Sequence, residues 1–392
     1  MPLPVRELLR AISPFGWTSL TVAAALVAAG WWLNWPELLV PGTALAAAVG
    51  FGFLACLGRP SFGATVNLSR GRVTAGQPAY GTVRVINTGR RRSLPAGLEL
   101  PVGGKRKSWT VPSLASGAAF ERGFEIDTSR RALVPIGPAS SVRGDPLGLV
   151  SRSVKWSDVS HLYVRPVVAR PTSIGAGLLR DLEGQATQNR ADSDLSFHAL
   201  REYIPGDDRR HIAWKASSKL GTLMVRQFED TRRTEIGLAL ATGQEGYGAW
   251  EEFELAVSVL ASIGLYGLRA GFAVRVLAGA AELRANRSQT LLDDCCSLAM
   301  SSAGLSAPKA ASELVSRMPD ATLTIVVGGS GIDPAALNAA FSRSRTGSRT
   351  LTVRASWGAE GKARSNGDVS ALTIGELDDL PRLLEVALRH VR

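Results

Sequence analysis

Residues 235–241, Glu-Ile-Gly-Leu-Ala-Leu-Ala (EIGLALA), open the part of the chain whose pattern decides the fold. A short apolar run of this kind is typical of a strand that is buried on both faces. Residues 250–268 (WEEFELAVSVLASIGLYGL) follow it and predict a helix. The same alternation continues to the C-terminus, with strands predicted at 272–278, 322–327, 350–354 and 371–374, and helices at 288–299, 334–341 and from 378 onward. Residues 231–392 are therefore predicted to form a doubly wound α/β domain with a mostly parallel sheet.

The loops after these strands are the places where ligands bind in open α/β sheets. Residues 241–246 (ATGQEG) match neither GxGxxG nor GxxxxGK[ST]. Thr242 and Glu245 can contact a metal ion, but hard cations need more oxygen ligands than these two supply. The glycine loop at 328–331 can bind an anion, although such a run is more often a simple turn. We therefore expect no metal and no cofactor.

Signs of catalysis are weak elsewhere. The four histidines (161, 198, 211 and 390) show no paired spacing, and the sequence has no GxSxG motif. A hydrolase needs a nucleophile, a base and an orienting group, and no such set is evident. We therefore expect that the protein is not an enzyme.

Residues 59–166 have a different pattern, in which short runs of alternating apolar and polar residues are separated by Gly, Pro, Asn and Ser. This pattern predicts an all-β, immunoglobulin-like antiparallel sandwich in which Asp145-Pro146-Leu147-Gly148 forms a turn. Residues 59–165 hold 17 Lys and Arg against 6 Asp and Glu, a net charge of +11 that equals the net charge of the whole chain. The basic surface is either simply solvated or attracts polyanions, meaning nucleic acid or anionic lipid.

Two uncharged apolar stretches precede this domain, from Trp17 to Leu33 and from Leu38 to Leu57. Each is close to the length of a membrane-spanning helix, so residues 16–58 are predicted to form a two-helix membrane hairpin. A signal peptide is the alternative for the first stretch. Cations flank the pair on both sides and none lies in the link, so the positive-inside rule places residues 1–15 and the C-terminus in the cytoplasm. The basic domain would then lie beside an anionic leaflet, which explains its charge better than nucleic acid does.

The densest chemistry lies in residues 201–214, REYIPGDDRRHIAW, within a segment (167–230) expected to be a linker that carries a motif. Pro205-Gly206 predicts a turn, and Asp207 or Asp208 can cap a helix over 209–219 that ends at Gly221. A strand at 223–228 carries Arg226. The carboxylates exceed what one cap requires, which indicates an ionic network with the neighbouring arginines. Such a network either locks a domain junction or docks a partner, and catalysis is the weakest alternative.

This motif resembles the signature of the domain-of-unknown-function 58 family, on the positions Arg201, Tyr203, Gly206, Asp207, Asp208, Arg210, Ile212, Trp214 and Arg226. The order of the predicted segments is similar too, including a GP…DPxGL segment in the β domain. The resemblance implies a membrane helix pair, a β-sandwich and a von Willebrand factor A-like α/β domain. Ala241, Gly243 and Glu245 stand where metal-binding domains of that type have Asp-x-Ser-x-Ser, so metal-dependent adhesion is not expected.

Family members are associated with MoxR-type AAA+ ATPases. The resemblance therefore implies a membrane-anchored cytoplasmic interaction or scaffold protein that partners such an ATPase in protein maturation or envelope stress. The alternative is polyanion binding through the basic β domain, with anionic lipid favoured over nucleic acid. Arg201, Tyr203, Gly206, Asp207, Asp208, Arg210, Trp214 and Arg226 are the expected docking residues, and Trp17, Leu33, Leu38 and Leu57 bound the expected membrane helices.

Overall fold

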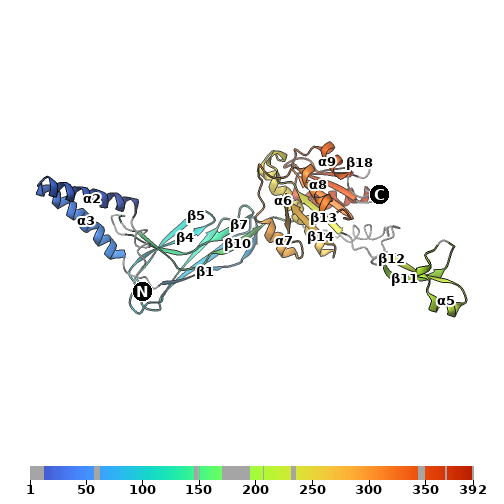
Figure 1. The fold of residues 1–392 in the computed structure, drawn as a ribbon, viewed down its shortest axis with the longest axis horizontal. Coiled ribbons are helices and arrows are strands. Elements are labelled where there is room, and N and C mark those ends of the chain that lie inside the picture. Colours follow the sequence, from blue (N-terminus) through green and yellow to red (C-terminus); the bar gives the residue numbers. More distant parts are fainter. Residues whose placement is uncertain are drawn as a thin grey trace. The chain divides into compact units, whose positions relative to one another are not determined.

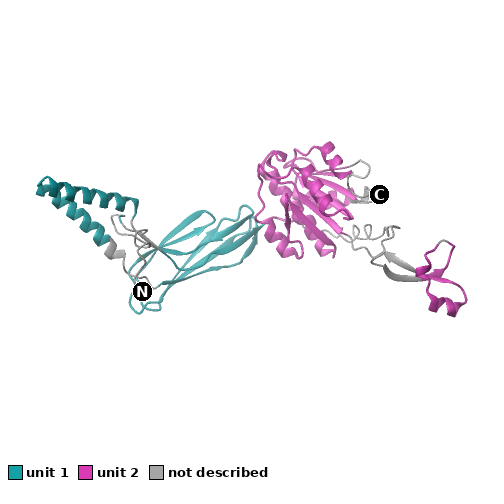
Figure 2. Ribbon diagram, in the orientation of Figure 1, with its two compact units in different colours: residues 1–165 teal, residues 166–392 magenta. Residues whose placement is uncertain are grey.

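The computed structural model describes residues 13–56, 62–144, 149, 151–169, 195–205, 207–230, 235–342, 349–366 and 369–390. The chain divides into two compact units, residues 1–165 and 166–392 (Figure 2). The first contains the two N-terminal helices and the β domain, and the second contains the motif and the α/β domain.

The N-terminal helices are α2 (Pro14–Trp32) and α3 (Pro36–Cys56), which pack against each other. Ser13 caps α2 by accepting a hydrogen bond from the Gly16 amide at 2.9 Å. Gly30 and Gly42 allow the close packing, since a Cβ at either would come within 3 Å of Leu39 or Val27. Leu33 is the C-terminal cap residue of α2, Trp17 and Leu38 lie within the helices, and Leu57 lies outside the described residues.

The predicted membrane hairpin is supported only in part. Within the described residues, α2 is the one helix that is long and apolar enough to cross a membrane. The apolar part of α3, 36–52, is shorter than a span, so the second span predicted from Leu38 to Leu57 is not supported. Polar Thr43 and the helix-internal Pro41 lie in this shorter part.

The β domain consists of two sheets (Figure 1). The first has the antiparallel order β1 (Phe62–Leu68), β3 (Ala79–Asn87) and β6 (Ala119–Ile126). The second runs in the order β2 (Arg72–Thr74), β10 (Ser160–Arg165), β7 (Ala132–Ile136), β4 (Ala96–Val102), β8 (Ser140–Gly144) and β9 (Ser151–Lys155), with β5 (Lys105–Val111) also paired to β4. The pairing of β2 with β10 is parallel, so the sheet is mixed rather than purely antiparallel as predicted.

The two sheets share one core. Buried and exposed residues alternate along β3 and β4, as expected for strands with one face inward. The inward side chains of both sheets, among them Val83, Val85, Leu98, Leu100 and Phe124, form a single buried cluster. This arrangement fits the predicted β-sandwich in outline. Its predicted turn at 145–148 lies outside the described residues.

The α/β domain has the sheet order β15 (Ala281–Leu283), β14 (Ala273–Ala278), β13 (Glu235–Leu240), β16 (Leu323–Gly328), β17 (Arg349–Ala355), β19 (Val369–Ile374) and β18 (Lys362–Asn366). The five inner strands are parallel, and β15 and β18 are antiparallel edges. The strands predicted from the sequence are all present, within one or two residues at each end. The two short edge strands were not predicted.

Helices cover both faces of this sheet (Figure 1). On one face, α6 (Trp250–Arg269), α7 (Ser288–Cys295) and α10 (Leu380–His390) pack on the side chains of Leu238, Ile325 and Val353 and their neighbours. On the other face, α8 (Ala307–Arg317) and α9 (Pro334–Phe341) pack on Ala239, Leu277 and Val326. The domain is therefore doubly wound, as predicted. The sequence did not predict α8, and α7 ends at Cys295 rather than at 299.

Candidate functional site: the β-ribbon arm

The motif lies on a β-ribbon, residues 195–230, which we call the arm. Strands β11 (Leu195–Glu202) and β12 (Met224–Asp230) pair antiparallel with a bulge between Phe197 and Ala199. On the other edge of β12, Ile212 forms a bridge to Val225, and the Ala213 amide donates to the Met224 carbonyl at 2.8 Å. Val225 thus lies between Arg201 and Ile212. Part of the predicted linker is therefore a small sheet. Its strands β11 and β12 lie on either side of most of the motif in the sequence and pair with each other.

Arg201 and Asp207 close the loop between the strands. The two guanidinium NH groups of Arg201 donate to the two carboxylate oxygens of Asp207 at 2.8 and 2.6 Å. The same carboxylate accepts a hydrogen bond from the Ile204 amide at 2.9 Å. Hydrogen bonding to Asp207 raises the pKa of the Arg201 guanidinium. This forked geometry fixes both groups in one orientation, so residues 201–207 form a defined loop.

Asp208 has a separate role as a helix cap. Its Oδ1 accepts a hydrogen bond from the Arg210 amide at 2.9 Å, at the start of a single 3-10 turn, η1 (Arg209–His211). The helix predicted over 209–219 is therefore wrong in its first part, because Ile212 is extended and forms a bridge to β12, and the Ala213 amide is bonded to the same strand. The α-helix, α5, spans only Trp214–Leu220.

The end of α5 is as the sequence predicted. Gly221 adopts a left-handed conformation with φ 72°, and its amide donates to the Ser217 carbonyl at 2.9 Å. Ser217 is buried and fastens the helix to the ribbon, since its hydroxyl accepts a hydrogen bond from the Met224 amide at 2.8 Å. The arm's buried contacts are thus made by Ile212, Ala213, Ser217 and Val225.

The remaining motif side chains face solvent. Trp214 is 67% exposed, and Ile204, Leu220 and Leu223 are exposed as well. Five cations share this exposure and form no ion pair within the described residues: Arg209, Arg210, Lys215, Lys219 and Arg226. The predicted ionic network therefore reduces to the Arg201–Asp207 pair among these residues, and Tyr203 joins the ribbon through its backbone, donating to the Leu223 carbonyl. Gly206 and the side chains of Glu229 and Asp230 lie outside the described part of the chain.

A second polar cluster, which the sequence did not reveal, lies where β13 and β16 end. Glu252, in the first turn of α6, is only 7% exposed. Its Oε2 accepts hydrogen bonds from the Gly248 amide (2.9 Å), the Ser330 amide (3.2 Å) and the Ser330 hydroxyl (2.8 Å). In the sequence, the sign of this cluster is Glu251-Glu252 at the start of the helix. Acidic residues in a first turn ordinarily lie at the surface, where they interact favourably with the helix dipole.

Tyr247 completes the closure of this edge. Its hydroxyl donates to the Ala241 carbonyl at 2.6 Å, and burial, followed by the nearby Glu252 charge, raises its pKa. The Gly331 amide donates to the Gly246 carbonyl at 3.1 Å. Gly329 permits this approach, because a Cβ there would lie 2.4 Å from the Gly246 oxygen. The chain's own loops therefore occupy the position where doubly wound domains usually bind ligands.

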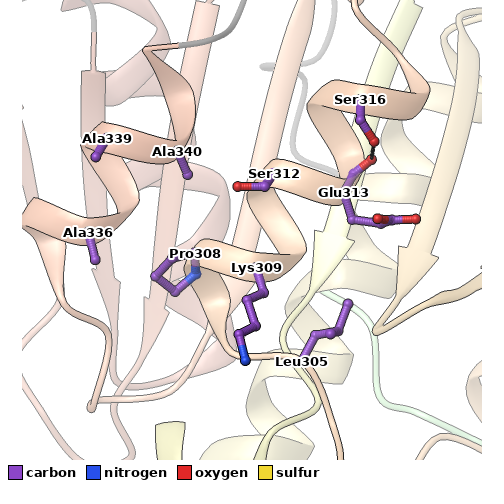
Figure 3. Close-up of a pocket in the computed structure, with 9 residues that line it drawn as sticks. All are labelled: Leu305, Pro308, Lys309, Ser312, Glu313, Ser316, Ala336, Ala339 and Ala340. Carbon is purple, nitrogen blue, oxygen red and sulfur yellow. Dashed lines mark hydrogen bonds between the residues drawn. The ribbon is translucent and has the colours of Figure 1, made fainter.

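Two further features bear on a metal or small-molecule site. Among the residues described, no group of three or more His, Cys, Asp or Glu side chains is placed to hold a metal ion. A groove of about 630 Å³ lies between α8 and α9 (Figure 3). Lys309 and Glu313 are the charged residues of its lining, which otherwise consists of Leu305, Pro308, two serines and three alanines. The side chains of Lys309, Ser312 and Glu313 point in different directions rather than toward one another (Figure 3).

The fold and this geometry define a class of protein: a doubly wound α/β domain preceded by a β-ribbon arm. Residues 199–285 match the model of a family described as a protein of unknown function, DUF58. The match confirms the resemblance drawn from the motif. It begins in β11, covers most of the arm and continues through β13 and α6 to β15, so Glu252 lies within it as well.

Solved structures give only distant similarities. A CARDB domain from Pyrococcus furiosus is 19% identical, covers 27% of this chain and 88% of its own, and has a TM-score of 0.22. The sporulation control protein Spo0M from Bacillus subtilis is 14% identical over 38% of this chain and 63% of its own, with a TM-score of 0.17. Similarities of this size carry no argument about function. No curated protein sequence matches the chain.

Proposed function

We propose that this protein is a membrane-anchored interaction protein that docks a partner through its arm. The observation that carries the proposal is the division of labour within the motif. Hydrogen bonds within the arm's own loop and turn are made by Arg201, Asp207 and Asp208. Trp214 and the five cations, in contrast, face solvent. Exposed tryptophan and arginine side chains on a preorganised support are typical of the residues that dominate binding energy at protein interfaces.

The partner we propose is a MoxR-type AAA+ ATPase, as the family resemblance implies, in protein maturation or envelope stress. The arm's surface chemistry supports a protein partner with an acidic surface surrounding an apolar pocket. Arg209, Arg210, Lys215, Lys219 and Arg226 would meet the acidic rim, and Trp214 with Leu220 would enter the pocket. Complementary charge of this kind speeds association and fixes orientation.

The remaining domains would serve as anchor and scaffold. We propose that α2 and α3 form a membrane hairpin with both chain ends in the cytoplasm, supported by the apolar length of α2 and the absence of charge in the link. The β domain would be immunoglobulin-like and the α/β domain von Willebrand factor A-like. Because Glu252, Ser330 and Tyr247 close the edge of the sheet, this domain would act without a metal and without catalysis.

The docking proposal is tested with a surface substitution that leaves the arm's fold intact. Trp214→Ser removes an exposed ring, and Trp357→Ser is the matched control because Trp357, in the α/β domain, is 62% exposed. We expect Trp214→Ser to lower recovery of the ATPase with the detergent-solubilised full chain at least tenfold, since central aromatic residues commonly contribute about 2 kcal/mol or more. The control should retain normal recovery.

A second pair of variants separates docking from folding. Asp207→Ala/Asp208→Ala removes the carboxylates that hold the loop and should weaken recovery by disordering the surface. Arg226→Ser removes an exposed cation and should weaken it while the arm stays folded. Unchanged recovery with all three variants, each shown to be folded, would overturn the docking function.

A second candidate function is polyanion binding through the basic β domain, which carries the net charge of +11. It predicts binding of nucleic acid or anionic vesicles that weakens steeply with salt. The docking variants in the arm should leave such binding unchanged, so the two functions are distinguished by the same set of proteins.

A further inference from the structure

In the β domain, the loop between β3 and β4 carries three adjacent cations. Residues 88–95 (TGRRRSLP), which we call the arginine loop, connect β3 to β4. Arg90, Arg91 and Arg92 are all exposed and form no ion pair with the described residues. Two other cations of the domain have acidic partners, since Arg84 pairs with Glu121 at 3.2 Å and Lys105 with Asp127 at 3.6 Å.

The backbone of the arginine loop is held firmly. Asn87 is 2% exposed, and its side-chain NH₂ donates to the carbonyls of Arg91 (2.9 Å), Leu114 (2.9 Å) and Ala115 (3.2 Å). Its side-chain oxygen accepts from the Gly89 amide at 3.0 Å. Ser93 ties the other end, since its amide donates to the Leu114 carbonyl and its hydroxyl accepts from the Leu114 amide. The three arginines are thus displayed on a preorganised support.

Next to the cations lies an exposed apolar residue. Leu94 is 67% exposed and follows Arg92 by two positions, with the exposed Pro95 beyond it. A leucine beside arginines on a loop tip is the combination that enters a lipid interface, where the apolar side chain reaches the acyl boundary and the cations stay at the headgroups. Nucleic acid would use the arginines but would leave Leu94 without a role.

Strand register places this loop at the membrane end of the domain. Phe62, the first residue of β1, pairs directly with Asn87, the last residue of β3. The helix α3 ends at Cys56, so the connection to Phe62 spans at most about 20 Å. At the same end, Leu149 between β8 and β9 packs against Val49 of α3. The loop is therefore tethered close to the end of α3.

We propose that the arginine loop binds the headgroups of anionic phospholipids, with Leu94 inserted at the acyl boundary. The inference rests on the proposed membrane anchoring by α2 and α3. Each arginine near an anionic surface strengthens attachment about fivefold. Three of them on a fixed loop hold the base of the β domain against the leaflet and so limit how the domain can turn on its tether.

The test uses the full chain in nanodiscs of phosphatidylcholine, alone or with phosphatidylglycerol, followed by hydrogen–deuterium exchange. We expect the amides of residues 90–92 and 94 to exchange at least about fivefold more slowly when the anionic lipid is present. Arg90→Gln/Arg91→Gln/Arg92→Gln should abolish this difference. Lys105→Gln/Arg106→Gln/Lys107→Gln is the matched control, because the turn before Lys105 lies at the opposite end of β4. It should retain the difference.

Each other outcome contradicts the proposal. Equal exchange in both lipids, or equal loss in both triple variants, would show that the loop has no specific contact with headgroups. Protection of the loop by a short DNA duplex in neutral discs, matching that by phosphatidylglycerol, would assign it to nucleic acid. Alkaline extraction of membranes distinguishes the loop contact from the membrane anchor. Release of the wild-type chain would overturn the proposed anchoring by α2 and α3. Retention of the chain without protection of the loop would overturn only the loop contact.

Discussion

At the scale of single residues, the adjacent aspartates of the motif perform different tasks. Asp207 receives a forked pair from Arg201 and the Ile204 amide, and Asp208 caps the turn that follows. The sequence predicted that one of the two would be a cap and that a surplus carboxylate would pair with arginine. It could not identify which, because the assignment depends on where the loop folds back onto β12.

Arg201→Lys tests the fork. Lysine keeps the charge but cannot present two parallel N–H groups to both oxygens of Asp207. We expect the amides of Ile204 and Asp207 to exchange several times faster with deuterium, because the loop that Asp207 organises loosens. Arg275→Lys, which breaks a similar fork to Glu282 in the α/β domain, is the control and should leave these amides unchanged. Unaltered exchange in Arg201→Lys would show that charge alone orders the loop.

The buried Glu252 gives a second prediction at this scale. Ser330→Ala removes the hydroxyl that donates to the Glu252 carboxylate at 2.8 Å. A buried charged acceptor that loses a donor costs about 1–3 kcal/mol, which corresponds to a fall in Tm of roughly 2–4 °C for each kcal/mol. Ser316→Ala is the control, since that hydroxyl is exposed and donates to the Glu313 carbonyl within α8 (Figure 3). Equal thermal stability of the two variants would contradict a structural role for the Glu252 cluster.

At the scale of elements, apolar runs located the central parallel strands because β13, β16 and β17 are buried on both faces. It failed for β11, whose partner β12 lies beyond the intervening loop and η1 and α5. It also failed for the helix over 209–219, where pairing of Ile212 and Ala213 with β12 overrides helical preference. The edge strands β15 and β18 are too short or too polar to be recognised, whereas α8 (APKAASELVSR) has a buried apolar stripe at helical spacing in its sequence.

One link between elements has a predictable dependence on pH. Arg284, after β15, donates to Asp294 of α7 through its Nε at 3.1 Å and through its amide at 2.8 Å. The side-chain hydrogen bond from Arg284 is the main cause that lowers the pKa of Asp294. A lowered pKa in the folded state stabilises the protein above the unfolded value, about 4, and this stabilisation is lost as the pH falls through the folded value.

Asp294→Asn should therefore destabilise the chain at pH 7 by about 1 kcal/mol, because the Arg284 side chain is well exposed, and by less at pH 3, which lies below the unfolded pKa of about 4. Thermal unfolding of the detergent-solubilised protein at both pH values measures the difference. Glu376→Gln is the control, because Glu376 is exposed and has no ion pair among the described residues. A destabilisation by Asp294→Asn that is equal at both pH values would exclude the ion pair as its source.

At the scale of the whole molecule, charge is arranged by domain. The excess of +11 falls within residues 59–165, whereas the rest of the chain is balanced. The arm adds exposed cations around Trp214, and the arginine loop adds three at the end of the β domain that is tethered to α3. We propose a different partner for each of these two cationic surfaces, a protein for the arm and a lipid surface for the loop.

The proposed partners require the β domain and the arm to lie on the cytoplasmic side, which leads to a prediction of topology. Arg59, Arg70 and Arg72 follow α3, whereas the link between the helices, residues 33–35, holds no cation. The positive-inside rule then favours an external link and internal ends. A reporter that is active only in the cytoplasm should be active when fused after Arg392, and one active only outside should work when inserted at Asn34. An external signal after Arg392 would mean either that α2 alone spans the membrane or that the hairpin has the opposite orientation, and would place both cationic surfaces where no cytoplasmic ATPase reaches them.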